Sequence, residues 1–165
     1  MAKKNKNQQK TESGVKIIAV NRQARHEYIF EEFFEAGIAL QGTEVKSLRE
    51  GRLSLVDAYA VVDDFNQVWL KGLNISKWHY ASTFNHDPMR ARRLLLNKSE
   101  IRRLKARTHE KGLTIIPTKL YFKKNYIKVE IALSRGKKLY DKREDMAKKS
   151  AQRTMERALK DLSRY

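Results

Sequence analysis

The stretch LTIIPTKLYFKKNYIKVEIAL, residues 113–133, decides the fold. Its second half alternates more regularly than any other part of the chain. Ile127, Val129, Ile131 and Leu133 fall on one face of an extended strand, and Tyr126, Lys128, Glu130 and Ala132 on the other. Pro117 predicts a sheet edge or a bulge, since proline has no N–H for the ladder. With KKN as the loop, the stretch predicts an antiparallel hairpin of strands 113–122 and 126–133.

Four other segments have the composition of strands: residues 15–20, 26–40, 58–62 and 68–70. The longest of them, HEYIFEEFFEAGIAL, is expected to bend near Gly37. DDFNQ, residues 63–67, predicts a hairpin loop between the last two. About six strands with turn signals favour a mainly β protein whose antiparallel sheet closes into a small barrel.

Two or three short helices are predicted beside the strands, two of them from clear local signals. In GTEVKSLREG, residues 42–51, Thr43 is expected to cap a helix that Gly51 ends. Residues 85–112 also carry helical signals. There, Asn97 and Glu100 have the spacing of a capping box, Ile101 and Leu104 form a narrow apolar stripe, and Gly112 suits the position after the helix.

The last segment, residues 135–165, predicts a basic tail that is disordered when free and helical on a partner. Its apolar stripe is Ala147, Ala151, Met155, Ala158, Leu159 and Leu162. Half of these residues are alanine, so the stripe buries little area and an isolated helix is marginal. The alternative is a helix that packs on the domain. Residues 1–13 predict a disordered basic tail, either a solubilising segment or an RNA-touching arm, which leaves 14–134 as the folded domain.

The net charge of +17 points to an anionic partner, and the position of the charge is informative. Residues 17–85 carry seven basic and nine acidic side chains, whereas 86–111 carry nine and three, and 135–165 carry eleven and five. This uneven distribution favours a polyanion bound along particular surfaces. No apolar stretch is long enough to span a membrane and the N-terminus lacks the apolar core of a secretory signal, so we expect a cytoplasmic protein.

Little in the sequence indicates catalysis or a cofactor. The chain has no cysteine, and its four histidines are scattered without metal-ligand spacing. Asp63 and Asp64 could hold a metal in a nuclease, but a polar hairpin tip explains them better. We therefore expect a binding protein with no metal and no cofactor, rather than an enzyme.

Five short motifs in order then identify a family: GIALQGTEVKSLREG, DAYA, RRLLLNKSEI, GLTIIPTKLYF and RGKKLYDKR. Together they resemble the SsrA-binding protein family over about residues 21–143. The resemblance implies a bacterial protein with an OB-like barrel that binds the tRNA-like domain of transfer-messenger RNA (tmRNA). It implies a role in trans-translation on stalled ribosomes, with alanyl-tRNA synthetase and elongation factor Tu as indirect partners and no membrane.

The resemblance also implies site residues. For tmRNA they are Asn21, Arg22, His26, Glu35, Leu95, Asn97 and Lys128. Asn97 is equally well explained as a helix cap, and Leu95 as core. Glu35 suits a polyanion only if its carboxylate accepts hydrogen bonds from ribose or a base amino group.

The basic junction is implied to meet the ribosome. Its candidate residues for the decoding centre are Gly136, Lys137, Lys138, Tyr140, Asp141, Lys142 and Arg143. Gly136 is expected to adopt an angle closed to other residues. The tail helix, with Met155, Ala158 and Leu159, is implied to enter the empty mRNA channel. The rival interpretations are a ribosomal or ribosome-assembly protein on ribosomal RNA, and, more remotely, an RNA hydrolase.

Overall fold

The structure is a computed structural model, and it describes residues 14–81, 84–109 and 112–162. The predicted N-terminal tail, residues 1–13, lies outside the described residues. The strands are β1 (Val15–Val20), β2 (Tyr28–Ile38), β3 (Leu53–Ser54), β4 (Tyr59–Val62), β5 (Val68–Lys71), β6 (Asn74–Ile75), β7 (Arg92–Leu95), β8 (Leu113–Lys123) and β9 (Tyr126–Gly136). The helices are α1 (Arg22–Glu27), α2 (Gly42–Arg49), α3 (Lys98–Thr108) and α4 (Leu139–Leu162).

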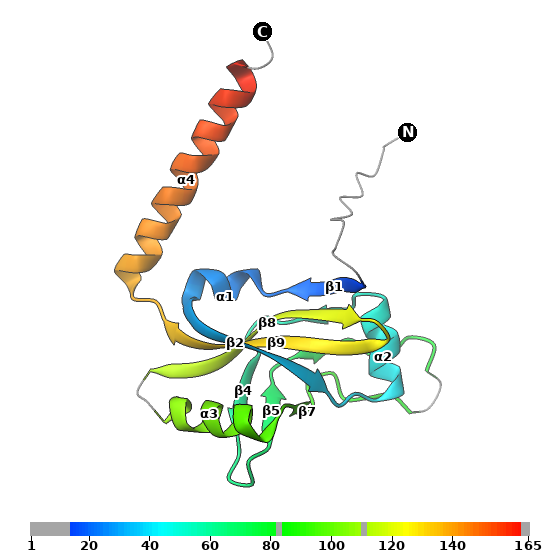
Figure 1. Ribbon diagram of the computed structural model, residues 1–165. Coiled ribbons are helices and arrows are strands. Elements are labelled where there is room, and N and C mark those ends of the chain that lie inside the picture. The colour runs from blue at the N-terminus through cyan, green and yellow to red at the C-terminus, as the bar shows by residue number, and fades with distance from the viewer. Residues whose placement is uncertain (1–13, 82–83, 110–111, 163–165) are drawn as a thin grey trace, which may run out of the picture.

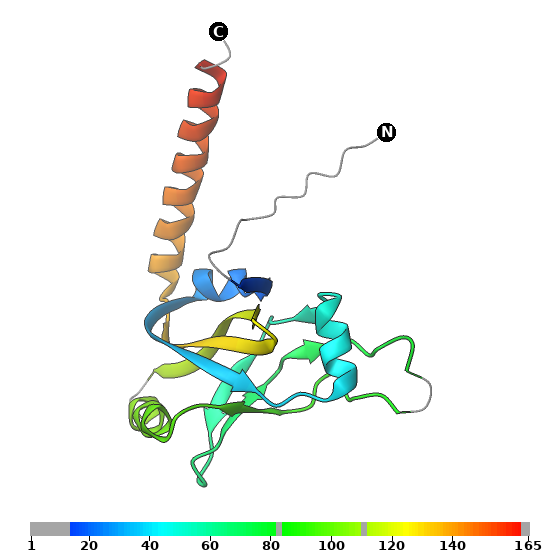
Figure 2. The same cartoon turned by 45° about the vertical axis from the view of Figure 1, so that its right-hand side comes forward.

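The main sheet closes into a barrel, as predicted. Around the ring the order is β8, β4, β5, β7, β2 and β9, and the pairing of β8 with β9 closes it. β1 adds to the outer edge of β8. Every pairing is antiparallel, and the ring of strands is visible in Figure 2.

The hairpin at residues 113–133 forms with the predicted loop. Tyr126 pairs with Lys123 at the turn, and the ladder runs to Leu113 opposite Arg135. The register shifts between Pro117 and Lys119, which confirms the predicted bulge. β9 continues to Gly136, so the strand is three residues longer than the alternation indicated.

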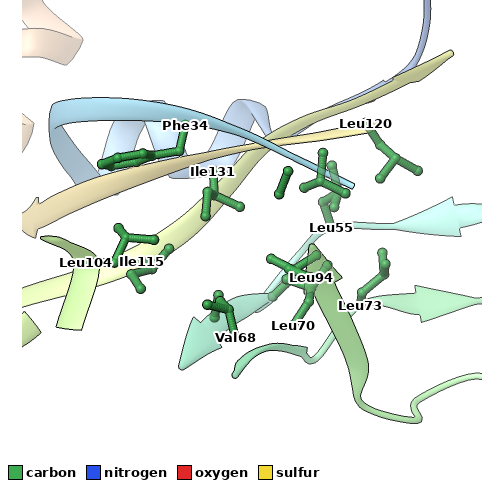
Figure 3. Close-up of a cluster of buried hydrophobic side chains, with 14 of the residues drawn as sticks. Phe34, Leu55, Val68, Leu70, Leu73, Leu94, Leu104, Ile115, Leu120 and Ile131 are labelled. Atoms are coloured by element: carbon green, nitrogen blue, oxygen red, sulfur yellow. The ribbon is translucent and has the colours of Figure 1, made fainter. Parts of the chain in front are cut away.

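Inward side chains of the strands fill the barrel (Figure 3). Val129, Ile131 and Leu133 are fully buried, as their alternation predicts. Leu104 of α3 joins this cluster, so α3 plugs one end of the barrel, where Figure 2 shows it end-on. Burial of this continuous apolar cluster is the main source of the fold's stability.

Helix α1 was not predicted, because residues 26–40 were assigned to one strand. Asn21 caps this helix: its Oδ1 accepts the N–H of Ala24 at 3.0 Å, and the strand begins only at Tyr28. His26 is therefore helical. An asparagine four residues before Arg25 and five before His26 was the available signal, since asparagine suits a helix start and basic residues suit the last turn.

The two predicted helices are present, with corrected ends. Helix α2 is capped by Gln41, whose backbone N–H donates to Glu44 at 2.7 Å, and not by Thr43. Asn97 caps α3, and its N–H donates to Glu100 at 2.9 Å, which confirms the predicted box. Helix α3 ends at Thr108 with His109 as its cap, so Gly112 lies three residues beyond that cap.

Residues 92–95 form strand β7, which corrects the helical assignment of the region before Asn97. Leu94 is buried and pairs with Ile38 and Val68, so this short strand is needed to close the ring. A run of only four residues beside a strongly basic helix gives little periodicity to detect.

The predicted tail helix is present as α4, which stands away from the barrel (Figure 1). Its dependence on a partner stays a prediction. The basic junction RGKKLYDKR is not one linker: Arg135 and Gly136 belong to β9, and the helix begins at Leu139. Within the described residues, none of the helices has the length and apolar character that crossing a bilayer requires.

Candidate RNA-binding surface

Three of the predicted tmRNA contacts lie on neighbouring strands. Gly37 of β2 pairs with Leu95 of β7 on one side and with Lys128 of β9 on the other. Directly paired residues share a face of an antiparallel sheet, so Leu95 and Lys128 flank the bare backbone of Gly37. Glu35 is two residues back on the same face. A Cβ on Gly37 would lie 3.2 Å from Cβ of Leu95, so glycine permits this close approach.

The carboxylate of Glu35 is held by three neighbours. The hydroxyl of Tyr121 donates to Oε2 at 2.6 Å, and Nζ of Lys123 donates to Oε1 and Oε2 at 3.0 and 2.9 Å. Nζ of Lys128 lies 3.9 Å from Oε1. The hydrogen bond from Tyr121, followed by that from Lys123, lowers the pKa of Glu35 below its ordinary value of 4.5.

Tyr121 is buried, and it complements Glu35. Burial raises the pKa of its phenol far above the ordinary value, and the hydrogen bond to Glu35 raises it further. Tyr121 therefore remains a neutral donor while Glu35 remains an anion. The pair presents an oriented carboxylate in a cationic surface, and this arrangement favours acceptance of hydrogen bonds over simple attraction of phosphate.

The row Leu95–Gly37–Lys128 forms part of the wall of a hollow of about 460 Å³. It is lined by Gly37, Ile38, Leu40, Val45, Arg49, Leu95, Phe122, Asn125, Tyr126, Ile127 and Lys128. Tyr126 is 72% exposed and Leu95 is 51% exposed, so neither is core. The structure thus assigns Leu95 to the surface, against the core alternative. The lining is mostly apolar and contains two cations, Arg49 and Lys128. This combination suits an unpaired base and its phosphates.

The other predicted tmRNA residues lie elsewhere. Asn97 is exposed at the start of α3, two residues past Leu95. Arg22 and His26 are exposed on α1 and do not line the hollow. Asn21 is buried. Its amide donates to the carbonyls of Leu55 and Pro117 at 3.1 and 3.2 Å, so its side chain serves the fold.

Beyond the end of β9, Lys137 of the basic junction is hydrogen-bonded to helix α1. The backbone N–H of Lys137 donates to the carbonyl of Glu27 at 2.8 Å, and its Nζ to the carbonyl of Arg25 at 3.0 Å. The N–H of Lys138 donates to Asp141 at 3.2 Å, at the start of α4. Lys142 and Arg143 follow in the helix.

The prediction for Gly136 is wrong. Its φ is not among the positive values found in the described residues, and a Cβ built on it meets nothing within 4 Å. Other residues would fit there, because Gly136 is simply the last residue of an extended strand. The chain turns after it, at Lys137 and Lys138.

The tail helix exposes its apolar stripe. Met155 is 69% and Leu159 is 66% exposed, and Ala158 and Tyr140 are exposed too. The helix approaches the body at α1, where His26 and Arg153 line a common hollow of about 530 Å³. Along the rest of its described length, the stripe has the form of a surface that lacks a partner.

Asp63, one of the two carboxylates that could hold a metal in a nuclease, has a structural role. Asp63 organises the β4–β5 hairpin: its oxygens accept the N–H of Gln67 at 2.7 Å and the indole N–H of Trp69 at 2.9 Å. The bond from Gln67 is the main cause that lowers the pKa of Asp63. This confirms the hairpin-tip interpretation. No group of three potential metal-ligating side chains occurs among the described residues.

A buried cluster of charged residues between α2 and β7 was not predicted from the sequence. Glu44 and Arg92 are fully buried, and Arg92 Nε donates to Glu44 Oε1 at 2.8 Å. Arg90 donates to the same carboxylate, with Nε at 2.8 Å from Oε1. These hydrogen bonds outweigh desolvation and lower the pKa of Glu44. The pairing joins α2 to β7, and its separation of 48 residues left no local signal.

A closed barrel with a cationic outer face, a hollow for a base and a basic tail helix defines the class of nucleic-acid-binding barrel proteins. Comparison with known proteins identifies the family. The family model described as SmpB protein matches residues 18–161, and the chain belongs to this family.

Relatives and a solved structure agree with this assignment. The chain is 54% identical over 145 residues to the SsrA-binding protein of Carboxydothermus hydrogenoformans, covering 88% of this chain and 97% of the relative. It is 53% identical to that of Acidothermus cellulolyticus over 148 residues, covering 90% and 92%. A chain from a solved structure of tmRNA–SmpB in the bacterial ribosome is 47% identical, with a TM-score of 0.63, over 73% of this chain and 85% of that one.

Proposed function

We propose that this protein binds tmRNA and acts with it in trans-translation on stalled ribosomes. Membership of the SmpB family supports this function, and the relatives carry the name SsrA-binding protein. The observation that carries it on the molecule is the row Leu95–Gly37–Lys128 with Glu35 beside it. Exposed apolar, cationic and acceptor groups meet there on one face, which is what an RNA with unpaired bases requires.

The site residues divide by role. Glu35, Leu95, Asn97 and Lys128 contact the tRNA-like domain, with Lys128 on phosphate. Asn21 positions α1 through its buried hydrogen bonds, Arg22 offers a cation on that helix, and His26 offers an exposed imidazole. Charging by alanyl-tRNA synthetase and delivery by elongation factor Tu are expected consequences of this binding, in the cytoplasm, with no catalysis and no cofactor in this chain.

In this proposal the tail binds the ribosome. Lys137, Lys138, Lys142 and Arg143 neutralise ribosomal RNA phosphates near the decoding centre, and Tyr140 offers an exposed ring for stacking. Asp141 caps the helix through the N–H of Lys138. Beyond them, Met155, Ala158 and Leu159 lie along the mRNA channel. What supports this placement is an apolar stripe left bare along α4, next to a strongly basic junction.

Recovery of bound RNA from cells tests the main proposal. Tagged full-length protein should return tmRNA, whereas recovery of ribosomal RNA alone would favour the ribosome-assembly interpretation. Purified protein should leave labelled RNA intact, because no catalytic group is assigned. In the same assay Glu35→Gln should bind tmRNA and a length-matched control RNA more equally, since the oriented carboxylate supplies selectivity.

Truncation after Arg143 tests the division between body and tail. The shortened chain keeps every strand and the Lys137 contacts with α1, so it should bind the tRNA-like domain like the full chain. Peptide tagging on stalled ribosomes should be lost. Loss of RNA binding on truncation would contradict the division.

A further inference from the structure

Trp69 is a large side chain on the outside of the barrel that the surface described above does not use. Val68 and Leu70 on either side of it are fully buried and point into the core (Figure 3). Alternation along β5 therefore turns Trp69 outward, where it is half-buried. Its indole N–H donates to Asp63 at 2.9 Å, which fixes the orientation of the ring.

The strand register surrounds this ring with cations and a second aromatic ring. Trp69 pairs directly with Arg93 of β7, and Lys71 pairs with Tyr59 of β4. Paired residues share a face, so the two rows lie side by side on the outside of β4, β5 and β7. Arg93, Lys71 and Tyr59 are exposed. We call these four residues the β5 platform.

We propose that the β5 platform binds unpaired nucleotides of tmRNA, with a base stacked on Trp69 and phosphates on Arg93 and Lys71. A rigid aromatic ring on a sheet with cations beside it is the arrangement that single-stranded RNA uses, because every base has a face that can stack. A protein partner fits less well, since the two exposed charges of the platform residues are positive and the whole chain carries +17. The adjacent carboxylate of Asp63 is engaged by the N–H groups of Gln67 and Trp69.

Continuity with the candidate surface selects tmRNA over ribosomal RNA. Arg93 and Leu95 both face outward from β7 and are two residues apart, or roughly 7 Å. An RNA that lies across Lys128, Gly37 and Leu95 therefore runs directly onto Arg93 and Trp69. The inference rests on the proposed function, and it extends the contact from β9 and β2 around the barrel to β5.

Tryptophan fluorescence tests the platform directly, because the chain has two tryptophans, Trp69 and Trp78. In the full-length Trp78→Phe protein, only Trp69 emits. Titration with the isolated tRNA-like domain should quench that emission through base stacking. In the full-length Trp69→Phe protein, which reports only Trp78, the same RNA should leave the emission nearly unchanged. Equal signals from the two proteins would overturn the proposal.

Affinities of full-length variants for the same RNA complete the test. Trp69→Leu keeps an apolar side chain but loses the ring, and should weaken binding roughly 5- to 100-fold, with recovery in Trp69→Phe. Arg93→Gln should weaken binding and lower the salt slope by about 0.7 to 0.9. The matched control is Arg157→Gln, an exposed arginine on α4, to which no tmRNA contact is assigned, and it should bind like the parent.

The outcomes separate this inference from the proposed function. If the parent protein fails to bind the tRNA-like domain, the proposed function falls. If the parent binds and Trp69→Leu binds equally well with its thermal unfolding unchanged, only the platform falls. If Trp69→Leu weakens association with ribosomes while leaving the affinity for the tRNA-like domain unchanged, the surface belongs to ribosomal RNA and the commitment to tmRNA is wrong.

Discussion

Glu35 shows how one residue can be both anionic and suited to RNA. An isolated carboxylate on a surface that binds phosphate would repel its ligand. Here Tyr121, Lys123 and Lys128 surround it, so its charge is locally offset and its oxygens are fixed in direction. A group held in this way discriminates by geometry, because only a donor at the correct position can replace water on the oxygens.

Replacement of Tyr121 by Phe should change the titration of Glu35. The Tyr121 hydrogen bond is the main cause of the lowered pKa, so Tyr121→Phe should raise the pKa of Glu35 toward its ordinary value. A lowered native pKa stabilises the fold above the unfolded value of about 4.5, and that contribution is lost as the pH falls through the native value. The carboxylate is partly exposed, so screening keeps this pH-dependent contribution below about 1 kcal/mol.

Two measurements check this prediction. Carbon NMR titration of the Glu35 carboxyl gives its pKa in each protein, and urea unfolding from pH 3 to 7 gives the stability. The pH-dependent part of the difference between parent and Tyr121→Phe should shrink below about pH 4, with Tyr126→Phe as the matched tyrosine control. An unchanged Glu35 pKa would show that the lysines alone hold the carboxylate.

The buried pair Glu44–Arg92 gives a second prediction at the residue scale. Glu44→Gln leaves the guanidinium of Arg92 buried without a counter-charge, and this should lower the free energy of unfolding by about 3–5 kcal/mol. The matched control is Glu50→Gln, whose 3.9 Å pair with Arg52 is exposed and should cost less than about 1 kcal/mol. Urea denaturation measures both changes. Equal losses would mean that the cluster contributes no more than a surface pair.

At the scale of elements, the sequence predicts what local alternation and turn chemistry specify. The β8–β9 hairpin, its Pro117 bulge and the β4–β5 hairpin follow from patterns within about twenty residues. Strand β7 and the Glu44–Arg92 pair could not be predicted, since their partners lie far away in the chain. Helix α1 was missed although Asn21 offers a local cap signal, whereas the contact of Lys137 with α1 joins residues far apart in the chain.

The candidate site also contains residues that could be predicted from the sequence and residues that depend on contacts between distant segments. The resemblance supplied Glu35, Leu95 and Lys128, and the strand register places them together. Tyr121, Lys123 and Tyr126 were not predicted as site residues. The alternation that places Lys128 outward was the signal available for Tyr126, whereas the approach of Tyr121 and Lys123 to Glu35 depends on the closed barrel.

Asn97 permits a prediction at the element scale, because it both caps α3 and lies beside Leu95. Asn97→Ala should lower the stability by about 1 kcal/mol through loss of the cap and should also weaken tmRNA binding. Asn97→Asp keeps a capping oxygen, so it should restore stability, while its negative charge should leave binding weak. Thermal unfolding and RNA affinity distinguish the roles. If Asn97→Asp restores both, Asn97 is only a cap.

At the scale of the whole molecule, the charges and the exposed apolar groups divide the protein into two working parts. The barrel carries the row from Lys128 to Leu95 and the platform around Trp69 on contiguous strands. The tail carries its own cations on a helix that meets the body near α1. Since the two parts share few contacts, each can meet a different RNA without distortion of the other.

Salt dependence should separate these two parts. Binding of the tRNA-like domain should weaken by roughly 0.7 to 0.9 log units per log unit of salt for each phosphate contact, so Lys128→Gln should lower the slope by about that amount. Truncation after Arg143 should leave this slope unchanged, because the tail is assigned no contact with tmRNA. On ribosomes, replacement of both Lys142 and Arg143 by Gln should lower the slope by roughly 1.4 to 1.8, since two assigned phosphate contacts are lost. Affinity measured at four salt concentrations, for both RNAs and for each variant, gives the slopes.

Two outcomes would contradict this division. A flat response of the parent protein would mean that its excess of lysine and arginine is solvated surface. A lower slope of the truncated chain on tmRNA would mean that the tail contacts tmRNA.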